Sequence, residues 1–131
     1  MIRPRTLVAA GLLLVVAGGA AGWLSQGNSR KEEIARALTG GDPRGAPALL
    51  TRYGCGGCHA IPGVPGADGR VGPPLGGLRE RVYIAGVLPN TAENLLQWLR
   101  DPPAHAPGTA MPPTGITEAE ARDVAAYLYA H

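Results

Sequence analysis

Residues 55–59, with the sequence CGGCH, constrain this chain more than any other feature. Two cysteines separated by two residues and followed directly by a histidine form the attachment signature of c-type haem. The two thiols can add to the two vinyl groups of one porphyrin, and the imidazole that follows is then held where it can bind iron. The motif predicts one covalent haem c, with Cys55 and Cys58 as attachment points and His59 as an iron ligand.

Two other interpretations of the cysteine pair are a thioredoxin-like redox pair and half of a zinc site. The remaining histidines, His105 and His131, are isolated, so no second pair with ligand spacing completes a zinc site. No βαβ pattern surrounds the motif, as a thioredoxin-like pair would require. The chain contains 20 Gly, 13 Pro and no Phe, a poor supply of side chains for a dense core. A buried porphyrin would relieve that shortage, which favours haem.

A haem iron with one histidine ligand has a sixth position to fill. Met111 is the only methionine besides the initiator. It lies in a predicted loop at 107–113 (PGTAMPP), whose prolines lower the conformational entropy that the backbone loses when the loop becomes ordered. Ligation by His59 and Met111 would raise the reduction potential and close the iron to substrates, which suits electron transfer. Alternatively, Met111 only packs in the loop, and His105 would be the rival ligand.

Three further side chains are candidates for the edge of the porphyrin. The indole N–H of Trp98 either donates to a haem propionate or the ring simply packs in the core. Arg79 and Arg81 carry forked donors that can pair with propionates, although a solvated surface role is the alternative for either.

The amino-terminal residues predict a membrane anchor. Residues 1–6 contain Arg3 and Arg5, and an apolar run follows at 7–24. A positive flank before an apolar stretch keeps the amino terminus in the cytoplasm and sends the rest outward. The run is barely long enough to span a bilayer but is longer than the apolar core of a typical signal peptide. Trp23 suits the interface between membrane and water. We expect an uncleaved anchor in the bacterial inner membrane and a periplasmic domain, with cleavage as the alternative.

Residues 25–42 predict a short helix capped by Ser29, with Glu32 three residues later, and ended by Gly40 and Gly41. This segment is either a spacer between membrane and domain or the first packed helix of the domain. The domain itself is expected at 43–131.

Within the domain the pattern predicts three helices joined by long loops. The first is expected at 47–53, the second at 90–101 with Asn90 and Glu93 as its capping pair, and the third from Thr117 to the carboxyl end. Residues 60–77 are rich in Gly and Pro and predict a loop. No period-two alternation is present, so the fold class is all-α.

Charge excludes one class of partner. From residue 43 onward seven arginines balance seven acidic side chains, and Lys31 is the only lysine. No basic surface for nucleic acid is therefore present, nor a ring of lysines for docking. Haem propionates would make the domain negative.

The chain resembles a known family of proteins. Its GCGGCH, VGPPL (71–75), NLLQWL and AMPP segments and the closing Tyr-bearing helix resemble class I c-type cytochromes in order and spacing. The resemblance runs from about residue 40 to 131. It is closest to small membrane-anchored bacterial monohaem cytochromes and to the cytochrome domain fused to subunit II of some haem-copper oxidases.

The resemblance implies a fold of a few short helices and long loops wrapped round one haem. It also implies that the carbonyl of Pro73 accepts the N–H of His59, and that the first and last helices cross, with Leu50 near Tyr127 or Leu128. Two departures stand out: the copper-binding domain that precedes the fused version is absent, and Leu50 occupies a position where Phe is usual.

These observations predict a one-electron carrier rather than an enzyme, tethered to the membrane and passing electrons between respiratory complexes, finally to a haem-copper oxidase. No small-molecule substrate or nucleic acid is expected. One alternative is a fixed electron-entry subunit of an oxidase or dehydrogenase. Another is a haem sensor or peroxidase in which Met111 is displaceable.

Overall fold

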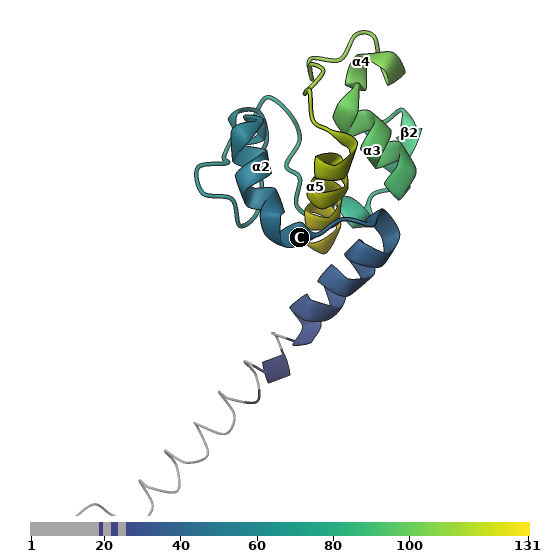
Figure 1. Ribbon diagram of the computed structural model, residues 1–131. Coiled ribbons are helices and arrows are strands. Elements are labelled where there is room, and N and C mark those ends of the chain that lie inside the picture. Colours follow the sequence, from purple (N-terminus) through teal and green to yellow (C-terminus); the bar gives the residue numbers. More distant parts are fainter. Residues whose placement is uncertain (1–18, 20–21, 24–25) are drawn as a thin grey trace, which may run out of the picture. The chain divides into compact units, whose positions relative to one another are not determined.

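The computed structural model describes residues 19, 22–23 and 26–131 (Figure 1). The chain divides into two units, Met1–Arg30 and Lys31–His131, and the second is the folded domain. Within the described residues no helix is long and apolar enough to cross a membrane. The predicted cytoplasmic segment at 1–6 lies outside the described residues, as does nearly all of the predicted anchor at 7–24.

The domain is mostly helical, as the sequence predicts. Its α-helices are α2 (Ala46–Arg52), α3 (Ala92–Arg100), α4 (Pro102–His105) and α5 (Glu118–Ala130). Three 3₁₀ turns accompany them: η1 (Pro43–Gly45), η2 (Cys55–Gly57) and η3 (Leu78–Glu80). Long loops connect these short elements, and α5 lies between α2 and α3 (Figure 1).

One small strand pair departs from the all-α expectation. Strands β1 (Tyr83–Ile84) and β2 (Leu88–Pro89) pair antiparallel, with Ile84 opposite Leu88. Residues 85–87 connect the strands; the Val87 amide donates to the Ile84 carbonyl at 3.0 Å, and the two residues between them, Ala85 and Gly86, have φ of 51° and 74°. Positive φ at both turn residues matches the twist of a hairpin. Strands of two residues are too short to show alternation, and Ala-Gly lacks the usual Asn or Asp, which explains why the sequence did not reveal them.

The core forms where α2, α3 and η1 contact α5. Leu50 on α2 belongs to the same buried cluster as Tyr127 and Leu128 on α5, in line with the expected packing of first against last helix. The apolar faces of α3 and α5 supply most of the remainder, which consists of small aliphatic side chains around a few Tyr and Trp rings.

Two of the three predicted caps differ from expectation. The Thr117 and Glu120 capping box of α5 is present. At α3 the cap is Thr91, whose hydroxyl accepts from the Asn94 amide, so the prediction of Asn90 was wrong. The Asn90 amide instead donates to the carbonyls of Leu78 and Arg81. Ser29 lies within the helical residues 26–39 rather than at their start.

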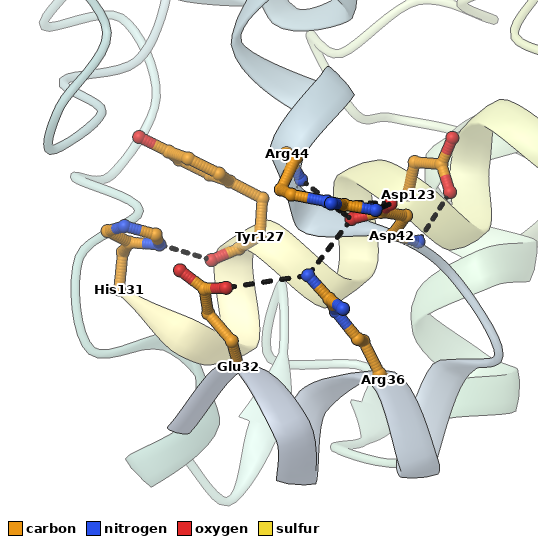
Figure 2. A network of polar contacts seen from close by, with 7 residues as sticks. All are labelled: Glu32, Arg36, Asp42, Arg44, Asp123, Tyr127 and His131. Atoms are coloured by element: carbon orange, nitrogen blue, oxygen red, sulfur yellow. Dashed lines mark hydrogen bonds and ion pairs between the residues drawn. The ribbon is translucent and has the colours of Figure 1, made fainter. Parts of the chain in front are cut away.

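Residues 31–42, which we call the N-terminal collar, pack on α5. Ala35 and Thr39 are buried, and the Arg122 guanidinium donates to the Thr39 carbonyl at 3.0 Å. The amide of Asp42 donates to the Asp123 carboxylate at 2.7 Å (Figure 2). Of the two possibilities that the sequence left open, spacer or packed helix, the contacts of the collar correspond to the second.

Charged side chains complete the collar, as Figure 2 shows. The Arg36 guanidinium lies 3.5 Å from the Glu32 carboxylate and 3.2 Å from that of Asp42. Arg44 pairs with the same Asp42 carboxylate at 2.6 Å. These hydrogen bonds to Arg44 lower the pKa of Asp42 far below its usual value, so Asp42 is ionised at all physiological pH values.

Candidate haem site

The attachment motif begins where α2 ends. Gly54 follows Tyr53 with φ of 69°, a left-handed conformation that glycine adopts without steric cost, and its amide donates to Thr51. Residues 55–57 then form η2, and the amides of Cys58 and His59 both donate to the Cys55 carbonyl, at 3.2 and 3.0 Å. The motif is therefore a single tight turn that carries its two thiols and its imidazole within five residues.

The state of the cysteines argues against the two other interpretations. Both thiols are unpaired; Cys55 is half-buried and Cys58 is exposed. Burial raises the pKa of the Cys55 thiol, whereas a reactive redox pair needs a lowered pKa. Among the described residues no group of three or more His, Cys, Asp or Glu side chains is arranged to hold a metal ion. Neither a thioredoxin-like pair nor a zinc site is supported.

The loop that follows the motif folds back along it. The amide of Gly69 donates to Gly56 at 3.1 Å, that of Gly72 to Cys58 at 2.8 Å, and that of Leu75 to Ala60 at 2.8 Å. The close approach needs residues without side chains, because a Cβ on Gly69 would lie 2.5 Å from the Cys58 backbone. This predicted loop at 60–77 is thus an ordered cover of the motif.

The loop determines how the His59 ring is held. Its Nδ1 lies 2.7 Å from the Pro73 carbonyl oxygen. A carbonyl can only accept, so Nδ1 carries the proton and donates it, which leaves Nε2 with a free lone pair. A histidine that binds a metal through one nitrogen commonly donates from the other in this way. The structure thus places His59 and Pro73 in the relation that the resemblance implies.

Met111 lies in the loop between α4 and α5. It is half-buried and packs against the core, and its amide donates to the hydroxyl of Thr109 at 3.2 Å. Thr114 ties the same loop to α3 by donating to the Leu99 carbonyl at 2.7 Å. These threonine contacts order the Pro-rich loop around its only thioether.

The predicted peripheral residues fall in different places. Trp98 is buried in the core. Arg79 is exposed and forms no hydrogen bond or ion pair with a described residue, whereas Arg81 donates to the carbonyls of Pro74 and Gly76. Arg81, which the sequence did not separate from Arg79, is thus the arginine held against the loop. His105 ends α4, beside an open cavity of about 430 Å³.

The residues present fit a covalently bound haem. Two unpaired thiols stand at attachment spacing, an imidazole with a free Nε2 follows them, and one half-buried thioether lies in an ordered loop. A mostly helical domain of short helices and long loops with this donor set is a haem protein of the c type.

Comparison with known proteins agrees with that class. Residues 44–130 match the family described as Cytochrome c, so the chain belongs to the cytochrome c family. Its cofactor is haem c, bound covalently through the motif that contains Cys55 and Cys58, and its chemistry is electron transfer.

Two relatives match part of this chain. Cytochrome c oxidase subunit 2 of Alkalihalophilus pseudofirmus is 40% identical over 75 residues, which cover 56% of this chain and 21% of that protein. Cytochrome c oxidase subunit 2 of Bacillus sp. (strain PS3) is 38% identical over 78 residues, covering 56% and 22%. The chain therefore spans about a fifth of the length of these relatives. No solved structure matches it.

Proposed function

We propose that this protein is a membrane-tethered one-electron carrier that passes electrons between respiratory complexes and delivers them to a haem-copper oxidase. The observation that carries the proposal is the likeness to two proteins named cytochrome c oxidase subunit 2. That likeness covers 56% of this chain. A domain of this type at an oxidase is suited to electron entry.

Each site residue has a proposed role. Haem c supplies the one-electron change between ferrous and ferric iron. Cys55 and Cys58 would tether it, while His59 and Met111 would ligate its iron. Pro73 fixes the tautomer of His59 through the 2.7 Å hydrogen bond. With no substrate position left at the iron, no residue is assigned an acid, base or nucleophile role.

Propionate contacts are proposed for the periphery. The Trp98 side chain is largely buried, and a propionate oxygen is the kind of acceptor that a largely buried indole N–H uses. Arg79 is exposed and forms no hydrogen bond or ion pair with a described residue, so its guanidinium can turn to a propionate. Arg81 would act through the loop it stabilises.

The proposed location is the bacterial inner membrane, with the domain in the periplasm. It rests on the two arginines before the apolar run at 7–24. A tether of this kind would raise the local concentration of the carrier near membrane complexes. Analysis of the mature amino terminus tests the anchor, since a protein that begins near Trp23 would have lost it.

Stopped-flow mixing of the reduced holoprotein with a purified haem-copper oxidase tests the function. We expect second-order reoxidation of the cytochrome, coupled to oxygen consumption. The Met111→Ala holoprotein is the comparison, because it retains haem but has lost the proposed ligand. A wild-type protein that the oxidase does not reoxidise would contradict the proposal.

A second candidate is a fixed electron-entry subunit of an oxidase. The relatives favour it because there the shared region is part of a longer oxidase subunit. The chemistry is the same, and only mobility differs. Purification in mild detergent distinguishes them: a fixed subunit should remain with a larger complex in constant ratio, and a mobile carrier should separate.

A further inference from the structure

Gly72 lies directly against the imidazole of His59. A Cβ built on Gly72 would stand 2.2 Å from Cε1, 2.6 Å from Nδ1 and 2.9 Å from Nε2 of that ring. Carbon atoms that are not bonded attract at separations of about 3.5–4.0 Å, so none of the three contacts is tolerable. The backbone of Gly72 is therefore the surface on which one side of the ring rests.

Backbone conformation does not explain the glycine. Gly72 is absent from the residues with positive φ, so another residue could adopt its conformation. Its amide is also engaged, donating to the Cys58 carbonyl at 2.8 Å, which prevents the loop from retreating without losing that bond. Space beside the ring is what requires glycine here.

We propose that Gly72 is a positioning residue for His59. Because no side chain intervenes, the ring lies against the loop with Nδ1 facing Pro73 and Nε2 left for iron. A methyl group at residue 72 would push the ring away from the loop and break the Nδ1 hydrogen bond at 2.7 Å. The inference rests on the proposed function in one respect, namely that His59 is an iron ligand.

The consequence is electronic as well as steric. Donation from Nδ1 to a carbonyl raises the basicity of a metal-bound imidazole. A more basic ligand favours the ferric over the ferrous state, so the wild-type arrangement lowers the reduction potential. Loss of the hydrogen bond should reduce the preference for ferric over ferrous iron by roughly tenfold. This change raises the reduction potential by about 59 mV for one electron.

Gly69 provides a matched control in the same loop. Its Cβ would clash as severely, at 2.5–2.6 Å, but with the backbone of Cys58 and Gly57 rather than with the imidazole. We therefore expect Gly72→Ala to raise the potential of the holoprotein, and Gly69→Ala to lower thermal stability while leaving the potential close to that of wild type. Equal shifts in both variants, or an unchanged potential in Gly72→Ala, would overturn the proposal.

A measurement on the wild-type holoprotein covers the case in which Gly72→Ala does not mature. In the ferrous state, NMR should show a strong nuclear Overhauser effect between Hα of Gly72 and Hε1 of His59, and slow exchange of the Nδ1 proton. Absence of both would overturn the proposal. If His59 were not a ligand, the imidazole protons would lack the upfield ring-current shifts of a haem-bound ring, so failure of the proposed function would be recognised separately.

Discussion

His59 takes its orientation from a residue fourteen positions further along the chain. Its Nδ1 donates to Pro73, while its backbone is tied to Cys55. Main chain and ring are thus held by different segments, the attachment turn and the loop that covers it. Met111 is held in a comparable way, by threonines before and after it in its own loop.

Replacing Met111 by alanine should lower the reduction potential. A thioether ligand favours ferrous iron, and no second methionine is available in the domain to take its place. The near-infrared charge-transfer band of the oxidised protein should disappear in the same variant. Pro113→Ala, in the same loop and exposed, serves as control. If Met111→Ala kept both the band and the potential, Met111 would not be the ligand.

At the scale of single residues, the sequence predicts the haem attachment residues, because covalent attachment requires them close together in the chain, and predicts little of the rest of the site. The thiol spacing and the adjacent histidine must be local in the chain, so a motif of five residues discloses them. Arg79 and Arg81 look equivalent because both follow the same Gly-rich stretch. Only the course of the chain after η3 shows that Arg81 reaches the carbonyls of Pro74 and Gly76.

Among the elements, α2 and α5 are joined by one carboxylate. Glu120 pairs with Arg52 and accepts from the Tyr53 hydroxyl at 2.7 Å, both at the end of α2. It also accepts from Thr117 in the capping box of α5. Hydrogen bonds from Tyr53 and then Thr117 lower the pKa of Glu120 from 4.5 to about 2. The same bond raises the pKa of Tyr53.

This shift predicts a pH dependence of stability. The folded-state pKa of Glu120 is lower than the unfolded value, so its stabilisation is complete above pH 4.5 and is lost as the pH falls toward about 2. Glu120→Gln should lower the melting temperature at pH 7, and the difference from wild type should shrink between these two pH values. Glu93→Gln, on the exposed side of α3, is the matched control for loss of a carboxylate, and equal melting temperatures for Glu120→Gln and wild type at pH 7 would contradict the prediction.

The collar gives a second prediction at the level of elements. Gly41 is buried with its Cα against α5, and a Cβ there would lie 2.1 Å from the Arg122 carbonyl oxygen. Gly41→Ala should therefore destabilise the domain by about 1–3 kcal/mol in chemical denaturation. Gly45→Ala meets open space with φ of −85° and should be neutral or slightly stabilising. Equal unfolding free energies for the two variants would show that the collar is not tightly packed.

Helix positions were more predictable than helix ends or contacts. The predicted helix at 47–53 is observed at Ala46–Arg52. Its position could be predicted because the proline at its start and its apolar spacing are both local signals. Asn90 and Thr91 are both good caps, and the choice depends on Asn90 being recruited by Leu78, Arg81 and Tyr129 from elsewhere in the fold. The packing of the collar also depends on distant residues of α5, which no local pattern discloses.

For the whole molecule, balanced charge is the property that governs encounters. The seven arginines and seven acidic residues from residue 43 onward leave the domain near neutrality before the propionates are counted. Five of them form ion pairs with one another, Arg52 with Glu120 and both Arg100 and Arg122 with Glu118. Partners are thus not attracted over long distances by a strong field of one sign.

Electron transfer to an oxidase should accordingly depend only weakly on salt. Between roughly 0.01 and 0.15 M ionic strength, where the Debye length falls from about 30 to about 8 Å, we expect the second-order rate to change by less than about tenfold. Stopped-flow reoxidation at several salt concentrations measures this. A steep fall with salt would reveal a concentrated charged docking surface instead.

The family match begins at residue 44, but the folded unit begins at Lys31. A form truncated at the family boundary would lose two hydrogen bonds, one from the Asp42 amide to Asp123 and one from Arg122 to the Thr39 carbonyl. It would also expose the part of α5 that Gly41 now covers. The useful place to remove the amino-terminal residues therefore lies before Lys31. Where a protein may be divided is a property of its contacts, and homology alone would here put the cut in the wrong place.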